Sequence, residues 1–431
     1  RKLLVGPVDP ALTRIALNNL GLVLELAGQW GEAIAMLSRS LAIDPQQDEV
    51  IYHWVRLRQR ICAWPIYANV PGITVAQMVE RTSAVAMLSV TDDPALQLAA
   101  ARRNMAGFAI AGLPDRAAGA RYGHARLRIG YLSSNFNLHA VSMLIAELLE
   151  LHDRQRVEVF AFSWSPEDGS PMLERIRAAV DHFVDITAHT DDAAAQAIRA
   201  AEIDVLIDLQ GLTTHARPRI LAQRPAPWQL AWLGHPGTAA VPGMDYLLAD
   251  RYLVPEDQQA FYAERLLYLP GCYQVNDRQR PRGRPTTRAE AGLPEDAVVF
   301  CAFNNTNKFT PEVFGTWMQI LREAPGSLLW LLADNPEAEA QLLGHVAGAG
   351  IDLARVKIAH RVPYLDYLSR FPLADVFLDT FPFNGGVTTS DALWMGVPVV
   401  TCAGRSFAAR MSGSLLHAVG LPELVTDSLA A

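Results

Sequence analysis

The glycine-rich segment Phe381–Asp391 carries the residues best suited to chemistry. It follows a strand-like apolar run, residues 374–379, and leads into a helical pattern. A turn that opens a helix leaves backbone N–H groups unpaired at the positive end of the helix dipole, so it can hold an anion. Asp391 lies three positions after Thr388, where a carboxylate can accept hydrogen bonds from sugar hydroxyls. The segment therefore indicates a nucleotide site, although turns that only connect a strand to a helix show the same pattern.

Lys308 and His139 also follow apolar runs that the pattern predicts to be strands. Lys308 closes the segment Phe303–Lys308, where its charge can stabilise a diphosphate as a leaving group. His139 closes the segment Ser133–His139, and an imidazole with a pKa of about 6.5 can accept a proton or bind a hydroxyl. A solvated lysine at a helix start and a structural histidine are the plainer alternatives when each residue is taken alone.

A further candidate is the turn His235-Pro236-Gly237-Thr238. Proline and glycine fix such a turn, and the hydroxyl and amide of Thr238 can contact a phosphate or a sugar. Turn chemistry without any ligand explains the same residues equally well.

The sequence does not predict a metal site. The acidic pairs Glu167-Asp168 and Asp191-Asp192 do not follow strand-like runs, and no HExxH pattern occurs. The four cysteines lie far apart without a CxxC pair, which argues against zinc and against a disulfide framework. A GxSxG nucleophile motif is also absent. We therefore assign the charge of a leaving group to Lys308 and to backbone amides.

Short apolar runs alternate with helical patterns from residue 127 onward, which predicts parallel sheets covered by helices. A segment rich in proline, arginine and glycine, residues 277–287, separates two series of runs and indicates a linker. Ligands of open α/β sheets bind beyond the carboxyl ends of the strands, where the polar segments lie. The runs are 127–132, 157–162, 203–209, 246–249 and 266–269, then 298–303, 328–332, 356–359, 376–379 and 397–402.

The first part of the chain has a helical pattern instead. Residues 17–45 show the spacing of one tetratricopeptide repeat, in which small residues let two antiparallel helices approach. A lone repeat cannot bury its own face, so it must pack on neighbouring helices. The matching positions are Leu17, Leu20, Gly21, Leu24, Ala33, Leu37 and Pro45.

Three regions follow from these patterns. We predict a repeat with a helical connector over residues 1–112 and two α/β lobes, over 113–285 and 286–431, of which the second contains the candidate nucleotide site. The fold class is therefore α/β, preceded by an all-α region.

Composition excludes some classes of protein. Of 431 residues half are apolar and 19% are charged, which is typical of a globular chain with large buried surfaces. The formal charge of −8 argues against a nucleic-acid partner, because a phosphate backbone needs a concentrated basic face. No uncharged apolar run approaches the roughly 20 residues that cross a bilayer. We expect a cytoplasmic protein without a membrane partner.

Taken together, the motifs resemble the O-linked N-acetylglucosamine transferase family, and the short length with few repeats is similar to its bacterial members. The family implies a GT-B architecture of two Rossmann-like lobes. It also implies inverting, metal-independent transfer from UDP-N-acetylglucosamine to Ser or Thr hydroxyls of a protein or peptide, with no cofactor. The segments that carry the resemblance are 58–64, 128–139, 224–238, 303–308 and 373–394.

The resemblance implies roles for single residues. Lys308 and Asn305 correspond to positions at the diphosphate, Thr388 offers its amide and hydroxyl to phosphate, and Asp391 holds the ribose. His139 corresponds to a proposed general base near the sugar. The remaining positions are those of the uracil, at the Val362 backbone, Tyr367 and Arg370; of the turn near the sugar, at Pro236 and Thr238; and of the glycine-rich loop, at Gly385, Gly386 and Val387.

The chain also departs from the animal members of that family. Gly386 and Val387 stand where those members carry His and Thr, and Asn135 replaces an Asp. We therefore expect the site to rely on backbone amides, Thr388 and Lys308. Two alternatives stay open at this point, a GDP-fucose-dependent protein O-fucosyltransferase and a catalytically weak repeat scaffold. The oligomeric state is not indicated by the sequence.

Overall fold

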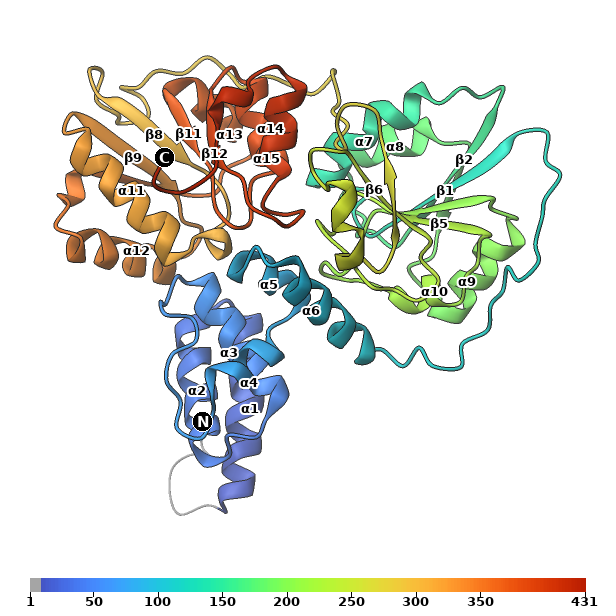
Figure 1. Cartoon of the computed structure of the whole chain (residues 1–431), viewed down its shortest axis with the longest axis horizontal. Coiled ribbons are helices and arrows are strands. Elements are labelled where there is room, and N and C mark those ends of the chain that lie inside the picture. The colour runs from blue at the N-terminus through green and yellow to red at the C-terminus, as the bar shows by residue number, and fades with distance from the viewer. Residues whose placement is uncertain (1–8) are drawn as a thin grey trace. The chain divides into compact units, whose positions relative to one another are not determined.

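A computed structural model describes residues 9–431, which divide into two compact units (Figure 1). Unit 1 consists of the chain up to Thr91 together with Arg282–Ala403 and Leu424–Ala431. Unit 2 consists of Asp92–Pro281 and Gly404–Glu423.

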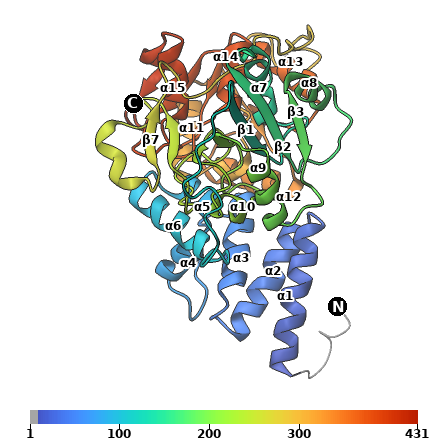
Figure 2. The same cartoon turned by 90° about the vertical axis from the view of Figure 1, so that its right-hand side faces the viewer.

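The helices at the start of unit 1 pack through small and aliphatic side chains. Helix α1 begins at Pro10 because the Asp9 side chain accepts a hydrogen bond from the Ala11 amide. Gly21 of α1 lies so close to α2 that an added Cβ would be 2.6 Å from Leu37 Cδ2, which explains the small residue. Figure 2 shows α1, α2 and α3 side by side. The helices are α1 (Pro10–Leu26), α2 (Trp30–Ile43), α3 (Asp48–Arg60), α4 (Val75–Arg81) and α5 (Ala84–Val90).

Unit 1 also contains a six-stranded parallel sheet in the order β10-β9-β8-β11-β12-β13. Strand β9 is buried along its whole length, as expected of a strand with helices on both faces. The elements are β8 (Val298–Ala302), η3 (Thr306–Lys308), α11 (Pro311–Glu323), β9 (Ser327–Leu332), α12 (Pro336–Gly348), η4 (Leu353–Arg355), β10 (Val356–Ala359), α13 (Tyr364–Arg370), η5 (Phe371–Leu373), β11 (Val376–Leu378), α14 (Val387–Trp394), β12 (Val399–Cys402) and β13 (Val425–Thr426).

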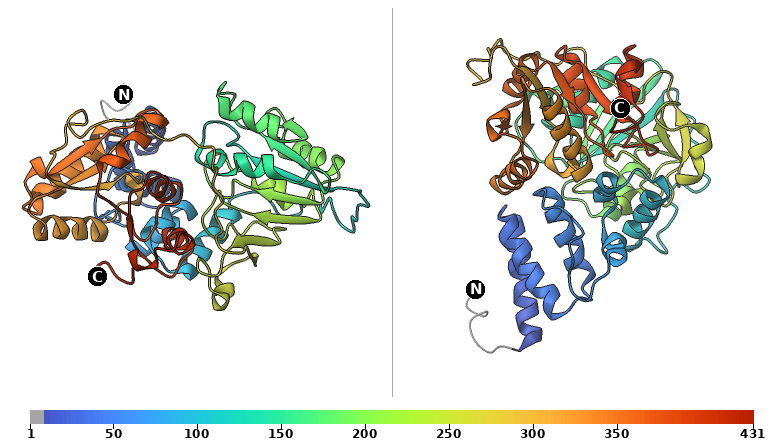
Figure 3. Two further views of the ribbon diagram at one scale, coloured as in Figure 1. Left: turned by 90° about the horizontal axis from the view of Figure 1, so that it is seen from above. Right: turned by 60° about the vertical axis from the view of Figure 1, so that its left-hand side comes forward.

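Unit 2 is built on a seven-stranded parallel sheet in the order β3-β2-β1-β4-β5-β6-β7. Helices cover its faces, as the view in Figure 3 shows. Its elements are α6 (Pro94–Ala106), β1 (Leu127–Ser133), α7 (Ala140–Leu151), β2 (Val157–Ser163), α8 (Pro171–Ala179), β3 (His182–Asp185), α9 (Asp191–Ala200), β4 (Val205–Asp208), α10 (Pro218–Ala222), β5 (Trp228–Ala231), β6 (Tyr246–Ala249), η2 (Glu256–Phe261), β7 (Arg265–Tyr268), α15 (Met411–Ala418) and η6 (Pro422–Leu424).

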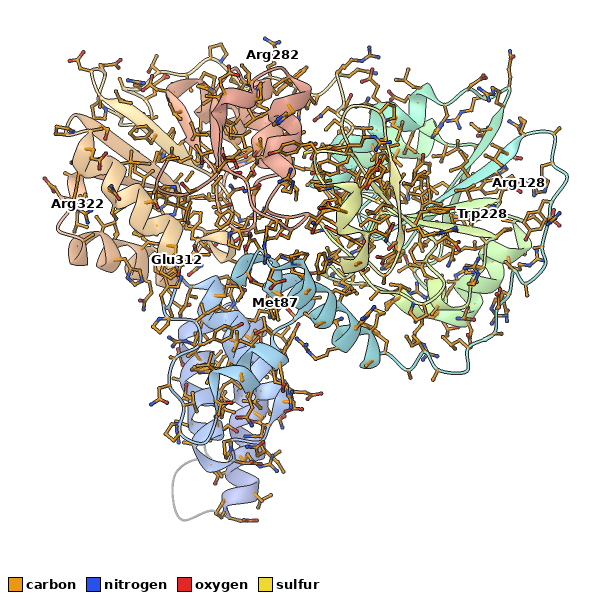
Figure 4. All side chains as sticks on the ribbon, in the orientation of Figure 1. Met87, Arg128, Trp228, Arg282, Glu312 and Arg322 are labelled. Atoms are coloured by element: carbon orange, nitrogen blue, oxygen red, sulfur yellow. The ribbon has the colours of Figure 1, made fainter. Side chains whose placement is uncertain are left out.

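The predicted fold class is confirmed, since both series of apolar runs form parallel strands. Strands β3, β5 and β13 were not among the predicted runs. β3 is an edge strand with no buried residue. Trp228 of β5, labelled in Figure 4, is half exposed. Strands with so little buried surface do not need the continuous apolar run on which the prediction relied. Within residues 9–431, none of the helices combines the length and apolar character needed to cross a membrane. The assignment of α1 and α2 to a tetratricopeptide repeat stays a prediction.

We expect Leu37→Ala to lower the free energy of unfolding by about 2–5 kcal/mol, because it removes a buried side chain between α1 and α2. Leu22→Ala, on the exposed side of α1, is the matched control and should change the free energy of unfolding by less than about 0.5 kcal/mol. Thermal and urea denaturation, followed by circular dichroism, measure both. Equal effects of the two substitutions would contradict the packing described above.

Candidate functional site

Lys308 lies at the end of η3, the short turn between β8 and α11. Its Nζ donates a hydrogen bond of 2.7 Å to the carbonyl oxygen of Asn384 and lies 3.7 Å from the centroid of the Phe383 ring. Burial lowers the pKa of the Lys308 ammonium to about 8, and the nearby carboxylate of Asp379 partly opposes this shift. The fold thus brings together the lysine and the glycine-rich loop, which are 76 residues apart in sequence.

Asp379, directly after β11, organises the loop that faces this lysine. One carboxylate oxygen accepts hydrogen bonds from Asn304 Nδ2 at 2.9 Å and from the Gly385 amide at 2.8 Å, and the other accepts from Thr401 Oγ1 at 2.7 Å. The Thr388 hydroxyl donates to Asn304 Oδ1. Sequence analysis missed Asn304 and did not assign Asp379 to the site. The available signal was their position at strand ends, since Asn304 directly follows the run 298–303 and Asp379 closes the run 376–379.

The start of α14 is the predicted phosphate seat. No side chain caps this helix at Gly386, and Thr388 lies in its first turn. An added Cβ at Gly385 would be 2.4 Å from Thr389 Oγ1 and 2.6 Å from Thr388 Oγ1, so only glycine lets the loop pack this closely. Val387 is the first residue of the helix. Gly386, the N-cap of α14, lies two residues after Asn384, whose carbonyl oxygen accepts the hydrogen bond from Lys308. The lysine and the helix N-terminus are therefore close together, which suits the binding of an anion.

Asp391, the predicted ribose ligand, is buried on the same helix. Its Oδ1 accepts a 3.0 Å hydrogen bond from the hydroxyl of Tyr364, at the start of α13. The rings of Tyr364 and Tyr367 lie 6.1 Å apart and close to parallel, with an angle of 26°. Tyr367 also packs edge-on against Phe371, at 5.1 Å. Tyr364 therefore positions the carboxylate, and the buried Tyr367 hydroxyl has no hydrogen-bond partner among residues 9–431.

Val362 and Arg370, predicted at the uracil, both line a cavity of about 500 Å³. Arg370 Nη1 donates a 2.7 Å hydrogen bond to the carbonyl oxygen of His360, and its guanidinium lies 5.8 Å from the Trp330 ring centroid. Trp330 Nε1 is buried and has no hydrogen-bond partner among residues 9–431. Trp330 also lines this cavity, with only 3% of its surface exposed, and the predicted contacts with uracil stay predictions. Asn305 precedes η3, and its carbonyl accepts from the Lys308 amide at 2.9 Å.

His139, in unit 2, is the N-cap of α7. Its Nδ1 accepts a 3.2 Å hydrogen bond from the Val141 amide, so the proton of the neutral ring lies on Nε2. Burial lowers the pKa of the imidazole. In this tautomer Nε2 carries a proton and can only donate a hydrogen bond. For Nε2 to accept a proton, the ring proton would have to move to Nδ1, which would break the hydrogen bond from the Val141 amide. The predicted role of His139 as a general base near the sugar stays a prediction.

The turn that contains Pro236 and Thr238 is packed tightly within unit 2. The Thr238 hydroxyl donates to a carboxylate oxygen of Glu264 at 2.6 Å, so in this structure it is engaged within the protein. Burial lowers the pKa of His235 to about 4, which keeps the ring neutral at physiological pH. An added Cβ at Gly234 would be 2.1 Å from the Leu209 carbonyl oxygen. The predicted ligand contacts of Pro236 and Thr238 stay predictions.

The ends of β1 and β4 are joined beneath this turn by Gln210. Its Oε1 accepts hydrogen bonds from the Ser134 amide at 3.1 Å, from the Ser134 hydroxyl at 2.9 Å and from Asn135 Nδ2 at 3.2 Å. Burial raises the pKa of the neighbouring Asp208 to about 6. Polar groups therefore gather at the carboxyl ends of the strands in unit 2, as they do in unit 1.

Two units with parallel sheets, polar groups at their strand ends and a lysine held on a glycine-rich loop are typical of glycosyltransferases of the GT-B architecture. A family model described as glycosyl transferase family 41 matches residues 116–282 and 284–430. The chain belongs to this family.

Similar proteins include curated sequences and a solved structure. The chain is 38% identical over 327 residues to a probable UDP-N-acetylglucosamine–peptide N-acetylglucosaminyltransferase, SEC, of Arabidopsis thaliana, with 74% of this chain and 33% of that protein covered. SPINDLY of the same plant is 32% identical over 70% of this chain and 34% of its own length. The chain thus spans about a third of the length of these relatives. A mutant O-GlcNAc transferase of Thermobaculum terrenum matches with a TM-score of 0.79 and 30% identity, over 97% of this chain and 81% of that one.

We expect Asp379→Asn to lower the free energy of unfolding by about 1–3 kcal/mol, because the new amide group must face a donor that the carboxylate satisfied. Urea denaturation of the purified protein measures the change. Thr401→Val, which removes only one of the donors, should cost less. An unchanged midpoint in Asp379→Asn would show that the carboxylate does not hold the loop.

Proposed function

We propose that the chain transfers N-acetylglucosamine from UDP-N-acetylglucosamine to Ser or Thr hydroxyls of proteins, with inversion and without a metal or other cofactor. The observation that carries this proposal is the contact between the Lys308 ammonium and the Asn384 carbonyl, which fixes a positive charge beside the helix start at Gly386. The relatives named for the same transfer support it. A cytoplasmic location belongs to the same proposal.

The donor is held by unit 1 in this mechanism. Lys308 and the amides at the start of α14 bind the diphosphate, and their attraction to it grows as negative charge develops on the leaving group. Asp391, oriented by Tyr364, accepts hydrogen bonds from the ribose. The uracil occupies the cavity lined by Val362 and Arg370, with Tyr367 nearby.

The transfer itself forms one bond and breaks another. The acceptor hydroxyl oxygen attacks the anomeric carbon from the face opposite UDP, and the bond from that carbon to the diphosphate oxygen breaks. The bonding electrons leave with UDP, whose charge Lys308 stabilises. The predicted role of His139, as the general base or a group that orients the acceptor hydroxyl, belongs to the same proposal. The proton of the hydroxyl then passes to water or to a phosphate oxygen.

We expect Lys308→Met to weaken UDP binding by about 10- to 100-fold, which corresponds to one lost charge-assisted hydrogen bond, and to leave uridine binding unchanged. Isothermal titration with UDP, uridine and GDP measures this. Arg322→Met, an exposed change on α11 labelled in Figure 4, is the control and should bind UDP like the wild type. A preference for GDP would favour the O-fucosyltransferase alternative, and no affinity for either nucleotide would favour the repeat scaffold.

UDP affinity should also depend on pH through Lys308. Because burial lowers the pKa of the free lysine to about 8, the ammonium is present below pH 8 and is lost as the pH rises through that value. Affinity should therefore be constant from about pH 7 to 7.5 and fall progressively towards pH 9.5. The same titrations on Lys308→Met should show no such fall. A wild-type affinity that stays flat over this range would contradict the assigned charge state.

A further inference from the structure

The turn that carries Lys308 is hydrogen-bonded to the helical region of unit 1, which comprises helices α1 to α5. The Thr306 hydroxyl donates a 2.9 Å hydrogen bond to the carbonyl oxygen of Arg60, the last residue of α3. Cys62 Sγ donates to the Thr306 carbonyl oxygen at 3.5 Å. Thr306 and Cys62 are both buried, with 1% and 0% of their surface exposed, so these bonds do not compete with water.

The chain after α3 is itself fixed against α12. Cys62 adopts a left-handed backbone conformation, with φ of 55°, and its carbonyl accepts a 3.1 Å hydrogen bond from His345 Nε2. The His345 ring stacks on Trp64, with centroids 4.5 Å apart and an angle of 21°. A non-glycine residue holds this conformation only where its surroundings enforce it, so the segment is a rigid support for the turn.

A second contact joins the helical region to α12. The Gly31 amide, at the start of α2, donates a 2.8 Å hydrogen bond to Glu337 Oε1, at the start of α12. An added Cβ at Gly31 would lie 2.9 Å from the same oxygen, so the two helix starts are closely fitted. The helical region is thus bonded to α12 at Gly31 and again at Cys62. These two contacts fix the position of the Arg60 carbonyl relative to β8.

Lys308 has little freedom between its neighbours. Thr306 is bonded to Arg60 on one side, and on the other Phe309 is buried in the core and packs edge-on against Trp317 at 5.1 Å. The turn contains only three residues, so a shift of Thr306 moves the Cα of Lys308 with it. Glu312, labelled in Figure 4, marks the first turn of the helix that follows.

We propose that Thr306 is a positioning residue for the diphosphate lysine, and that through it the end of α3 sets where Lys308 reaches. This inference rests on the proposed function, because it assigns Lys308 to a bound diphosphate. The helical region would then contribute to nucleotide binding through the position of Lys308. A change that displaces the Arg60 carbonyl should therefore also shift Lys308.

The test compares UDP with uridine in Thr306→Val, which keeps the shape and removes the hydroxyl, and in Thr306→Ser, which keeps the hydroxyl. We expect Thr306→Val to weaken UDP binding by about 3- to 10-fold, the effect of one hydrogen bond, with uridine binding unchanged. Thr306→Ser should stay within about twofold of the wild type. Cys62→Ala, a milder change in the same contact, should weaken UDP binding selectively and by less.

A double-mutant cycle separates positioning from plain stability. In the Lys308→Met background, Thr306→Val should cause no further loss of UDP affinity, because both changes act through the same amine. A loss of the same size in both backgrounds, or an equal loss for UDP and uridine, would overturn the inference. Thermal denaturation of each variant checks that the measured proteins are folded.

A direct measurement of the lysine keeps the inference testable even if the proposed function fails. The rate of Lys308 acetylation by acetic anhydride, followed by mass spectrometry over a range of pH, gives the pKa of the amine without any nucleotide. We expect Thr306→Val to raise this pKa towards the ordinary lysine value and Thr306→Ser to leave it unchanged. An unchanged pKa in Thr306→Val would overturn the inference. Absent UDP binding in the wild type would overturn the proposed function alone.

Discussion

The buried carboxylate of Asp379 is the interaction on which the rest of unit 1 depends. A buried charge is costly unless it is hydrogen-bonded or paired, and Asp379 receives donors from Asn304, Gly385 and Thr401. These donors come from three different segments, the ends of β8 and β12 and the glycine-rich loop. Satisfying one carboxylate therefore fixes the loop from which α14 starts, and the loop in turn accepts the Lys308 ammonium.

The same environment determines how the lysine can act. Its ammonium has lost much of its hydration, which is why its pKa is lowered, and it rests on a carbonyl oxygen and an aromatic face. A diphosphate that approaches it meets a charge that is already positioned and already partly dehydrated. Such preorganised charge stabilises a leaving group more than the same lysine would in water, because little of the surroundings must rearrange.

The sequence predicted the features that depend on local pattern. The long apolar strands, the glycine-rich loop and Lys308 all follow from runs and spacings within a few residues. Asn304 and the role of Asp379 did not, because their partners come from strands far away in sequence. The turn at Thr238 was visible in the sequence, but the partner of its hydroxyl was not, because Glu264 lies 26 residues further on. Short exposed strands such as β3 lack the apolar run that prediction needs.

The link between the helical region and Lys308 was hidden from the sequence for a different reason. Its acceptors are the backbone carbonyls of Arg60 and Cys62, which every residue type possesses, so no side-chain pattern marks them. The Arg60 carbonyl belongs to the last residue of α3, where C=O groups lack partners within the helix, whereas Cys62 lies two residues further on and its carbonyl also accepts from the Trp64 amide at 3.1 Å. Thr306 and His345 satisfy them from the nucleotide-binding side. The last residue of α3 thus supports the turn that carries Lys308, so the bonds that stabilise this turn also determine where the lysine lies.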